Sequence, residues 1–228
     1  MSKTKKVILF IVEGITDQTA LGNVLTSLLD NETVRFAMTD GDITTSRDVT
    51  AGNVINRVNA IVKSALQKYA FRLSDLIGAV HLIDTDGAFI PNAAILGKAN
   101  AEHIEYTSDT IYTAHVDSIV ARNTQKRNLV SILRSKSEIA SKPYKMFYFS
   151  RNMEHALHNE ARDLTSDEKM QLAEQFDDTY ADRPQDFVEY LRSGGFAAPG
   201  NYEESWKFIS DGTHSLERWS NFHVYFEK

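Results

Sequence analysis

The stretch KKVILFIVEGITDQTAL, residues 5–21, decides the fold. Its six consecutive apolar residues, Val7–Val12, predict a strand buried on both faces, as in a sheet covered by helices. Glu13 follows this strand directly, and Asp17 comes four residues later. Either Glu13 lies in a surface loop while Thr16 or Asp17 caps the next helix, or the acid holds a ligand, because open α/β sheets bind ligands beyond the carboxyl ends of their strands.

The chain continues as an alternation of strands and helices. After the strand at 6–12, further strands are predicted at 33–39, 76–86 and 144–150. Helices are predicted at 17–30, 51–69, 116–136 and 152–161, and the first two carry an apolar face at helical spacing. This order favours an α/β fold with a mainly parallel, Rossmann-like central sheet flanked by helices.

Two parts of the chain depart from that alternation. Residues 87–116, with Pro91 and scattered polar residues, are expected to be an insertion or long loop. The last part of the chain predicts short helices at about 165–181, 184–193 and 202–210. We therefore expect an α/β domain over residues 1–160 and a helical extension over 161–228 that packs on the same domain.

Residue composition and net charge narrow the class of protein to which this chain can belong. The 228 residues are 42% hydrophobic and 25% charged, which is typical of a soluble globular protein. The absence of cysteine excludes disulfides and thiolate metal sites and favours a reducing cytoplasm. The apolar run near the start is too short to span a bilayer and no cleavage site follows it, so no membrane segment is expected. The net charge of −6 does not indicate nucleic-acid binding, but carboxylates around a metal are compatible with a phosphate ligand.

A second pair of acids follows the third predicted strand. VHLIDTDGAF, residues 80–89, ends its apolar part on Asp84 and Asp86, spaced D-x-D. If the sheet is parallel, the first and third strands end at the same edge, so Glu13 can converge with these two acids. Carboxylates held together repel one another unless a cation compensates them. An all-oxygen ligand set suits Mg²⁺ or Mn²⁺ and metal-assisted phosphoryl chemistry.

An apolar strand ending in E-G, an acid four residues later, a helix, and a later apolar strand ending in D-x-D together resemble the TOPRIM (topoisomerase–primase) superfamily. VEGITDQTAL is most similar to small TOPRIM proteins akin to overcoming-lysogenization-defect nucleases and abortive-infection phage-defence proteins. The resemblance implies that Glu13 is a metal ligand or general base and that Asp84 and Asp86 hold Mg²⁺. It also implies that Asp17 helps to hold a second metal.

The segment FYFSRNMEHALHNE, residues 147–160, is similar to the segment after the fourth strand in those relatives. There Ser150 and Glu154 would complete the second metal site. The resemblance implies a Mg²⁺- or Mn²⁺-dependent nuclease that cleaves phosphodiester bonds in DNA or RNA. It also implies a role in phage defence and a separate ATPase partner. Residues 84–92 contain no lysine to neutralise a transition-state phosphate, so Lys98, Lys145 or Arg151 would have to supply that charge.

Two other functions remain open. LIDTDGAF also resembles the first motif of haloacid-dehalogenase phosphatases, with Asp84 as nucleophile, Ser150 as the second motif and Asp177–Asp178 as the paired acids. Against this, a full strand–helix–strand–helix precedes the motif, and the segment around Asp177 predicts a helix. The third possibility is a catalytically inactive TOPRIM module that binds or regulates a partner.

Several other polar residues have ordinary structural explanations. His81, within the third strand, is expected to be a hydrogen-bonded core histidine. Asp40 and Asp42 follow the second strand and are expected to form a turn with Gly41. The basic residues at 122–134 are expected to be a solvated face, with a phosphate-contacting stripe as the alternative.

Overall fold

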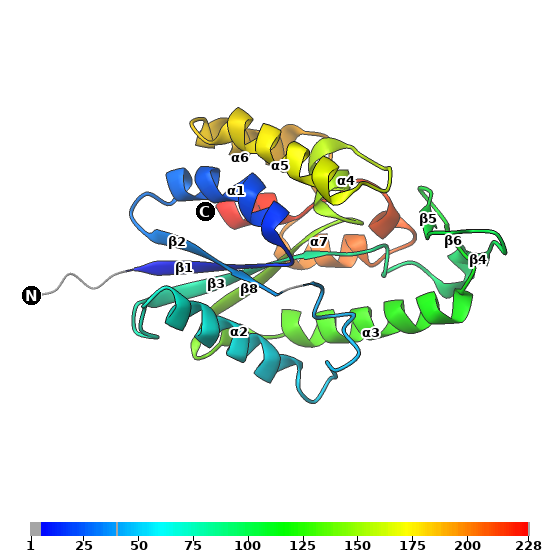
Figure 1. Ribbon diagram of the computed structural model, residues 1–228, viewed down its shortest axis with the longest axis horizontal. Helices are drawn as coiled ribbons and strands as arrows, with labels where there is room; N and C mark the ends of the chain where they lie inside the picture. Colours follow the sequence, from blue (N-terminus) through cyan, green and yellow to red (C-terminus); the bar gives the residue numbers. More distant parts are fainter. Residues whose placement is uncertain (1–5, 40, 228) are drawn as a thin grey trace, which may run out of the picture. The chain divides into compact units, whose positions relative to one another are not determined.

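The computed structural model describes residues 6–39 and 41–227 (Figure 1). The chain divides into two compact units that are interleaved along the sequence. The first runs up to Ile83 and includes Ser131–Phe147 and Leu164–Val188. The second comprises Asp84–Val130, Tyr148–Asp163 and the chain from Glu189 onward. These boundaries differ from the expected division between residues 160 and 161.

The first unit is built on a five-stranded sheet of order β2-β1-β3-β8-β7. The strand bounds are β1 Val7–Val12, β2 Thr33–Met38, β3 Leu76–Asp84, β7 Glu138–Ile139 and β8 Lys142–Phe149. β1 pairs in parallel with both β2 and β3, and β7 pairs antiparallel with β8. The expected α/β class with a mostly parallel sheet flanked by helices is confirmed.

The apolar pattern explains why these residues form the core of the first unit. All six residues of β1 are buried, as expected for a strand with helices on both faces. In Figure 1, α1 (Ile15–Leu28) and α5 (Ser166–Tyr180) lie on one side of the sheet, and α2 (Val54–Lys68) lies on the other. α1 packs against α5 and buries one face, formed by Ala20, Leu21, Val24 and Leu25.

The second unit contains a small sheet that the sequence pattern does not predict. β4 (Ile95–Gly97), β5 (Glu105–Tyr106) and β6 (Ile111–Thr113) pair in the order β4-β6-β5. They pack around a cluster formed by Ile90, Ile95, Ile111, Ile119 and Leu216. The expectation that residues 87–116 are irregular is therefore wrong, while their status as an insertion stays a prediction. Strands of two or three residues carry too few alternations for a periodic signal, so only contacts with distant residues identify them.

The remaining helices agree closely with expectation. They are α3 Val116–Arg134, α4 Met153–His158, α6 Pro184–Ser193 and α7 Tyr202–Ile209, with short 3₁₀ turns at Asn92–Ala94, His214–Leu216 and Phe222–Phe226. α4 ends earlier than the expected residue 161, because Asn159 adopts a left-handed conformation with φ +56°. Within residues 6–39 and 41–227, the structure contains no helix with the length and apolarity needed to cross a membrane.

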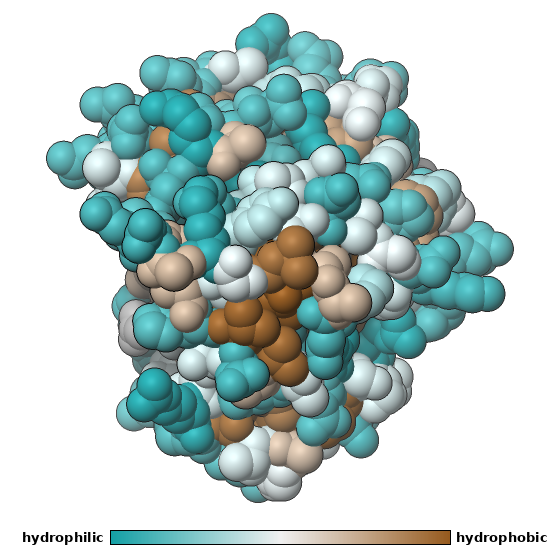
Figure 2. Space-filling model, turned by 90° about the vertical axis from the view of Figure 1, so that its right-hand side faces the viewer, coloured by the Kyte–Doolittle hydropathy of each residue, from teal (hydrophilic) through white to brown (hydrophobic). Residues whose placement is uncertain are grey.

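One face of the molecule carries a contiguous apolar area (Figure 2). In the second unit, Leu96 of β4 is 44% exposed. Ile104, Val116 and Val120 are only partly buried against the cluster that contains Ile111. The small sheet thus leaves part of its apolar surface in contact with solvent.

Candidate functional site: the D-x-D loop

The D-x-D loop, residues 84–90, starts at the last residue of β3 and opens the second unit. Between its two acids, Thr85 is fully buried, and its N–H donates to the carbonyl of Phe149 at the end of β8 (2.9 Å). The Thr85 hydroxyl accepts the N–H of Arg151 (2.9 Å), and the N–H of Asp86 donates to the carbonyl of Arg151 (2.8 Å). Three hydrogen bonds therefore hold the loop to the segment that follows β8.

The loop turns through two successive residues in the left-handed region. Asp86 has φ +50° and Gly87 has φ +66°. A non-glycine residue in this region costs on the order of 1 kcal/mol or more, so the surrounding contacts must hold Asp86 in place. At Gly87, a Cβ atom would lie 2.5 Å from Cδ2 of Leu216. Only glycine fits there without displacing Leu216.

Three basic side chains of α3 contact this loop. Lys126 Nζ lies 2.5 Å from Asp86 Oδ2, and Arg122 Nη2 donates to the Asp86 carbonyl (2.9 Å). Arg127 Nη1 donates to the carbonyl of Ala88 (2.7 Å). The expectation of a solvated basic face is wrong for Lys126, which is 0% exposed. The loop supplies the carboxylate that makes burial of an ammonium group tolerable.

The Asp86–Lys126 pair is asymmetric in its exposure. The Lys126 side chain is 0% exposed, whereas that of Asp86 is 32% exposed. Oδ1 of Asp86 has no hydrogen-bond partner within the described ranges, 6–39 and 41–227. One oxygen of Asp86 therefore neutralises a buried cation, and the other can accept a ligand.

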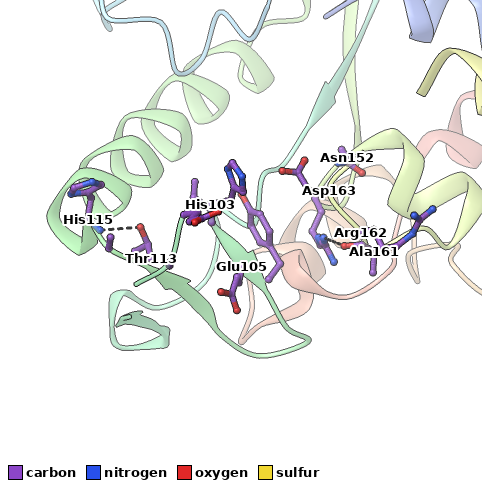
Figure 3. Close-up of a pocket in the computed structure, with 14 residues that line it drawn as sticks. His103, Glu105, Thr113, His115, Asn152, Ala161, Arg162 and Asp163 are labelled. Carbon is purple, nitrogen blue, oxygen red and sulfur yellow. Dashed lines mark hydrogen bonds between the residues drawn. The ribbon is translucent and has the colours of Figure 1, made fainter. Parts of the chain in front are cut away.

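An open cavity of about 800 Å³ lies in the same unit (Figure 3). Its walls come from residues 101–106, 113–115, 151–152 and 161–163. His115, just before α3, donates its N–H to Thr113 Oγ1 (3.0 Å), one of the dashed bonds in Figure 3. Arg151 binds the D-x-D loop through its backbone and lines the cavity with its side chain. The cavity and the loop thus share one residue.

The acids of the opening stretch belong to the first unit. Oδ2 of Asp17 accepts the N–H groups of Glu13 (3.0 Å) and Gly14 (3.1 Å). The N-cap of α1 is Gly14, and Asp17 is the third residue of the helix, so its carboxylate binds the N–H groups just before the first turn. Glu13 directly follows β1, which pairs with β3. The metal-binding roles of Glu13 and Asp17 stay predictions.

The two residues that the resemblance adds after β8 are both buried. Ser150 accepts the N–H of Trp219 (2.6 Å) and donates a short hydrogen bond to the carbonyl of Glu217. Its hydroxyl is thus used to hold the C-terminal segment. Glu154, on α4, is 6% exposed. Burial lowers the pKa of the nearby His158, and the Glu154 carboxylate partly opposes that shift.

Other acids singled out in the sequence have local roles or fall outside the described residues. Asp177 and Asp178 lie within α5, as expected for a helix, and Asp177 Oδ2 accepts the side-chain amide of Asn23 (2.8 Å). Asp42 Oδ1 accepts the N–H of Thr44 (2.7 Å), as in a turn. Asp40 lies outside the described residues.

Of the three cations suggested for phosphate neutralisation, two are in ordinary surroundings. Lys98 Nζ lies 2.6 Å from a carboxylate oxygen of Glu105, and Lys145 is exposed on β8. Arg151 is different, because it is 8% exposed and lines the cavity. Lys126 belongs to the basic residues at 122–134, for which a phosphate-contacting stripe is the alternative expectation, but a lysine in an amphipathic helix gives no local sign that it will be buried.

The donor set of the D-x-D loop fits a hard divalent cation in part. Among the described residues, no three histidine, aspartate or glutamate side chains form a group that could hold a metal. Mg²⁺ commonly binds to only one or two carboxylates and takes its other ligands from water and substrate phosphate. Asp84 and Asp86 can meet that smaller requirement, with Oδ1 of Asp86 as one donor.

The chain was compared with models of protein families, with characterised proteins and with solved structures, and no match was found in any of the three.

His81 takes the structural role expected of it. It is 1% exposed, and its Nδ1 lies 2.8 Å from the hydroxyl of Tyr144 on β8. This buried contact joins β3 to β8 within the first unit.

Proposed function

We propose that this chain is a divalent-metal-dependent phosphodiesterase that cleaves nucleic acid, DNA or RNA, at the D-x-D loop. The observation that carries the proposal is the construction of this loop. Its two acids flank a fully buried threonine, its backbone is tied to the segment after β8, and Asp86 meets a buried ammonium. Such preorganisation is typical of sites that stabilise charge during a reaction.

Asp84 and Asp86 would hold Mg²⁺ or Mn²⁺, which supplies Lewis-acid stabilisation of the phosphoryl group. Lys126 keeps one Asp86 oxygen in a fixed ion pair, so the carboxylate cannot swing freely between orientations. Arg122 holds the carbonyl of the same residue (2.9 Å), which fixes the loop from a second direction. The chain's own residues thus orient the ligand oxygens before any metal binds.

Glu13 would act as a further ligand or as the general base. The parallel pairing of β1 with β3 supports this role, because Glu13 and Asp84 come at the carboxyl ends of two neighbouring strands. Asp17 and Glu154 would contribute to a second ion, as the TOPRIM resemblance implies. A separate ATPase partner, a cytoplasmic location and a role in phage defence rest on that resemblance and on the absence of cysteine.

The test is cleavage of plasmid DNA and of structured RNA with Mn²⁺. Asp84→Asn and Glu13→Gln should each reduce cleavage by about 10²–10⁴-fold, the usual effect of losing a positioned acid–base or charge-stabilising group. The exposed Asp211→Asn is the matched control and should retain activity. Cleavage that persists in both variants would exclude these acids from the chemistry.

Metal binding gives an independent measurement. At one hundred times Kd, Mn²⁺ should raise the free energy of unfolding of the wild type by about 2.7 kcal/mol. Asp84→Asn should remove most of this gain. A phosphatase would instead hydrolyse p-nitrophenyl phosphate with a phosphorylated Asp84 that can be trapped, and would tolerate Glu13→Gln. A wild type that binds Mn²⁺ but cleaves no nucleic acid would favour a binding module.

A further inference from the structure

The cavity of the second unit is lined by a buried charge, that of Arg151. Arg151 is 8% exposed, and no ion pair joins it to a carboxylate among residues 6–39 and 41–227. Its guanidinium donates one hydrogen bond, from Nη2 to the carbonyl of Ala161 (2.8 Å), and Nε has no hydrogen-bond partner in the described part of the chain. The guanidinium carbon also lies 4.8 Å from the centre of the Tyr106 ring.

A guanidinium in these surroundings is unfavourable in the unliganded protein. Removing a cation from water costs several kcal/mol unless an anion or a full set of acceptors replaces the water. Burial accordingly lowers the pKa of Arg151 from its ordinary value, although arginine stays protonated at neutral pH. An anion in the cavity would compensate this charge, and the planar fork of arginine matches a phosphate group.

We propose that this cavity binds a nucleotide and that Arg151 holds its phosphate group. The cavity volume of about 800 Å³ is in the range of small-molecule sites and is far larger than a phosphate ion needs. The identification of the ligand as a piece of nucleic acid rests on the proposed function. The binding of a phosphate group by Arg151 does not depend on it.

Neighbouring groups suit the other parts of a nucleotide. The side-chain oxygen of Asn152 accepts the N–H of His155 (2.8 Å), which leaves its NH₂ group as a second donor to the ligand. His103 and His115 are exposed in the cavity wall and offer flat rings to a base. Asp163, which Figure 3 places on the Asn152 side, offers an acceptor for base or ribose donors.

The remaining charges of the cavity wall do not cancel the effect of Arg151. Glu105 is paired with Lys98 (2.6 Å), and Arg162 is paired with Glu160 (2.7 Å). Glu102 and Asp163 are exposed, so water and salt screen their repulsion of a phosphate. Arg151 is the wall residue that combines a charge with burial.

Arg151, which contacts both the cavity and the D-x-D loop, connects the nucleotide site to the proposed reaction. The N–H and carbonyl of Arg151 bind Thr85 and Asp86 (2.9 and 2.8 Å), so the cavity begins where the D-x-D loop is anchored. A strand that crosses the loop could therefore place a neighbouring nucleotide in the cavity.

The experiment measures binding to the full chain in EDTA, so that neither divalent metal nor cleavage contributes. The probes are 5′-AMP, adenosine and a 5′-phosphorylated trinucleotide, titrated by calorimetry. We expect 5′-AMP to bind about 10- to 100-fold more tightly than adenosine, the contribution of charge-assisted hydrogen bonds to one phosphate. Tighter binding of the trinucleotide than of 5′-AMP would identify a nucleic-acid strand as the source of the phosphate, and the reverse would identify a free nucleotide.

Arg151→Met should abolish the difference between 5′-AMP and adenosine, and Arg151→Lys should retain part of it. Arg162→Gln is the matched control, because Arg162 lines the same cavity but its side chain is 68% exposed. This variant should change binding by no more than about twofold.

The wild type provides a test that needs no variant, since 5′-AMP should shift the NMR signal of the Arg151 Nε–H. Equal affinity for 5′-AMP and adenosine, or an unshifted Arg151 signal at saturation, would overturn the proposal. Absence of cleavage by the wild type, or cleavage that persists in Asp84→Asn and Glu13→Gln, with 5′-AMP binding intact, would refute only the proposed function.

Discussion

Lys126 Nζ and Asp86 Oδ2 lie 2.5 Å apart, with the lysine fully buried and the aspartate one-third exposed. The pair joins α3 to the D-x-D loop across forty residues of sequence. Because the two charges differ in access to water, removing the aspartate charge and removing the lysine charge should change the free energy of unfolding by different amounts.

Asp86→Asn should lower the free energy of unfolding by about 3 kcal/mol, the lower end of the range for breaking a buried ion pair. The loss follows because the Lys126 ammonium stays buried without this carboxylate, while asparagine tolerates the φ of +50°. Lys126→Met should cost less, since water can solvate Asp86. Urea unfolding at pH 7 measures both.

The double variant Asp86→Asn/Lys126→Met is the control for this asymmetry. It should be close in stability to Lys126→Met alone, because the buried ammonium is removed together with the Asp86 carboxylate. A double variant as unstable as Asp86→Asn would show that the ion pair is not the cause of the loss.

Gly87→Ala should destabilise the protein more than Gly195→Ala. Both glycines have positive φ, +66° and +74°, so both substitutions incur backbone strain of roughly 1 kcal/mol. Only at Gly87 does the new Cβ meet another atom, Cδ2 of Leu216 at 2.5 Å. Equal losses of unfolding free energy in the two variants would mean that Leu216 moves aside at no cost.

Because of His155, the free energy of unfolding should decrease as the pH is lowered below neutrality. Burial, and then the positive charge of Arg151, lower its pKa from 6.5 to about 4. In the unfolded chain the His155 side chain is therefore protonated below pH 6.5, whereas in the folded protein it stays neutral down to about pH 4. Stability is fully present above pH 6.5 and decreases by about 3 kcal/mol as pH falls to about 4, at 1.36 kcal/mol per pKa unit.

Urea unfolding at pH 7 and pH 4.5 measures this dependence. His155→Gln should flatten it, whereas the exposed His103→Gln should leave it unchanged. Burial also lowers the pKa values of His158 and His223, so part of the slope will remain in His155→Gln. An NMR titration that places the His155 pKa near 6.5 would contradict the prediction.

Asp17→Ala should lower the free energy of unfolding by about 1 kcal/mol, because it removes the acceptor of the Glu13 and Gly14 N–H groups. Asp17→Asn keeps an acceptor oxygen and should cost less. If Asp17 only caps α1, the stability gain from Mn²⁺ will be the same in Asp17→Asn and wild type. A reduced Mn²⁺ gain in Asp17→Asn would instead support its predicted role as a metal ligand.

The sequence by itself determined the α/β class and the order of the long elements. Six apolar residues in β1 and the helical spacing in α2 specify buried faces, because burial of apolar surface depends on patterns that repeat within one element. The sequence also identified the acids after β1 and β3 as candidate site residues, because each follows directly on a buried strand.

Tertiary structure alone decided which charges meet. Lys126 and Asp86 are forty positions apart, and nothing in the sequence around a helical lysine predicts that a loop will enclose it. The burial of Arg151 beside a cavity and the small sheet from Ile95 to Thr113 have the same origin. A buried charge is stable only through partners that the whole fold brings to it, so its position follows from packing between distant segments and leaves no local pattern in the chain.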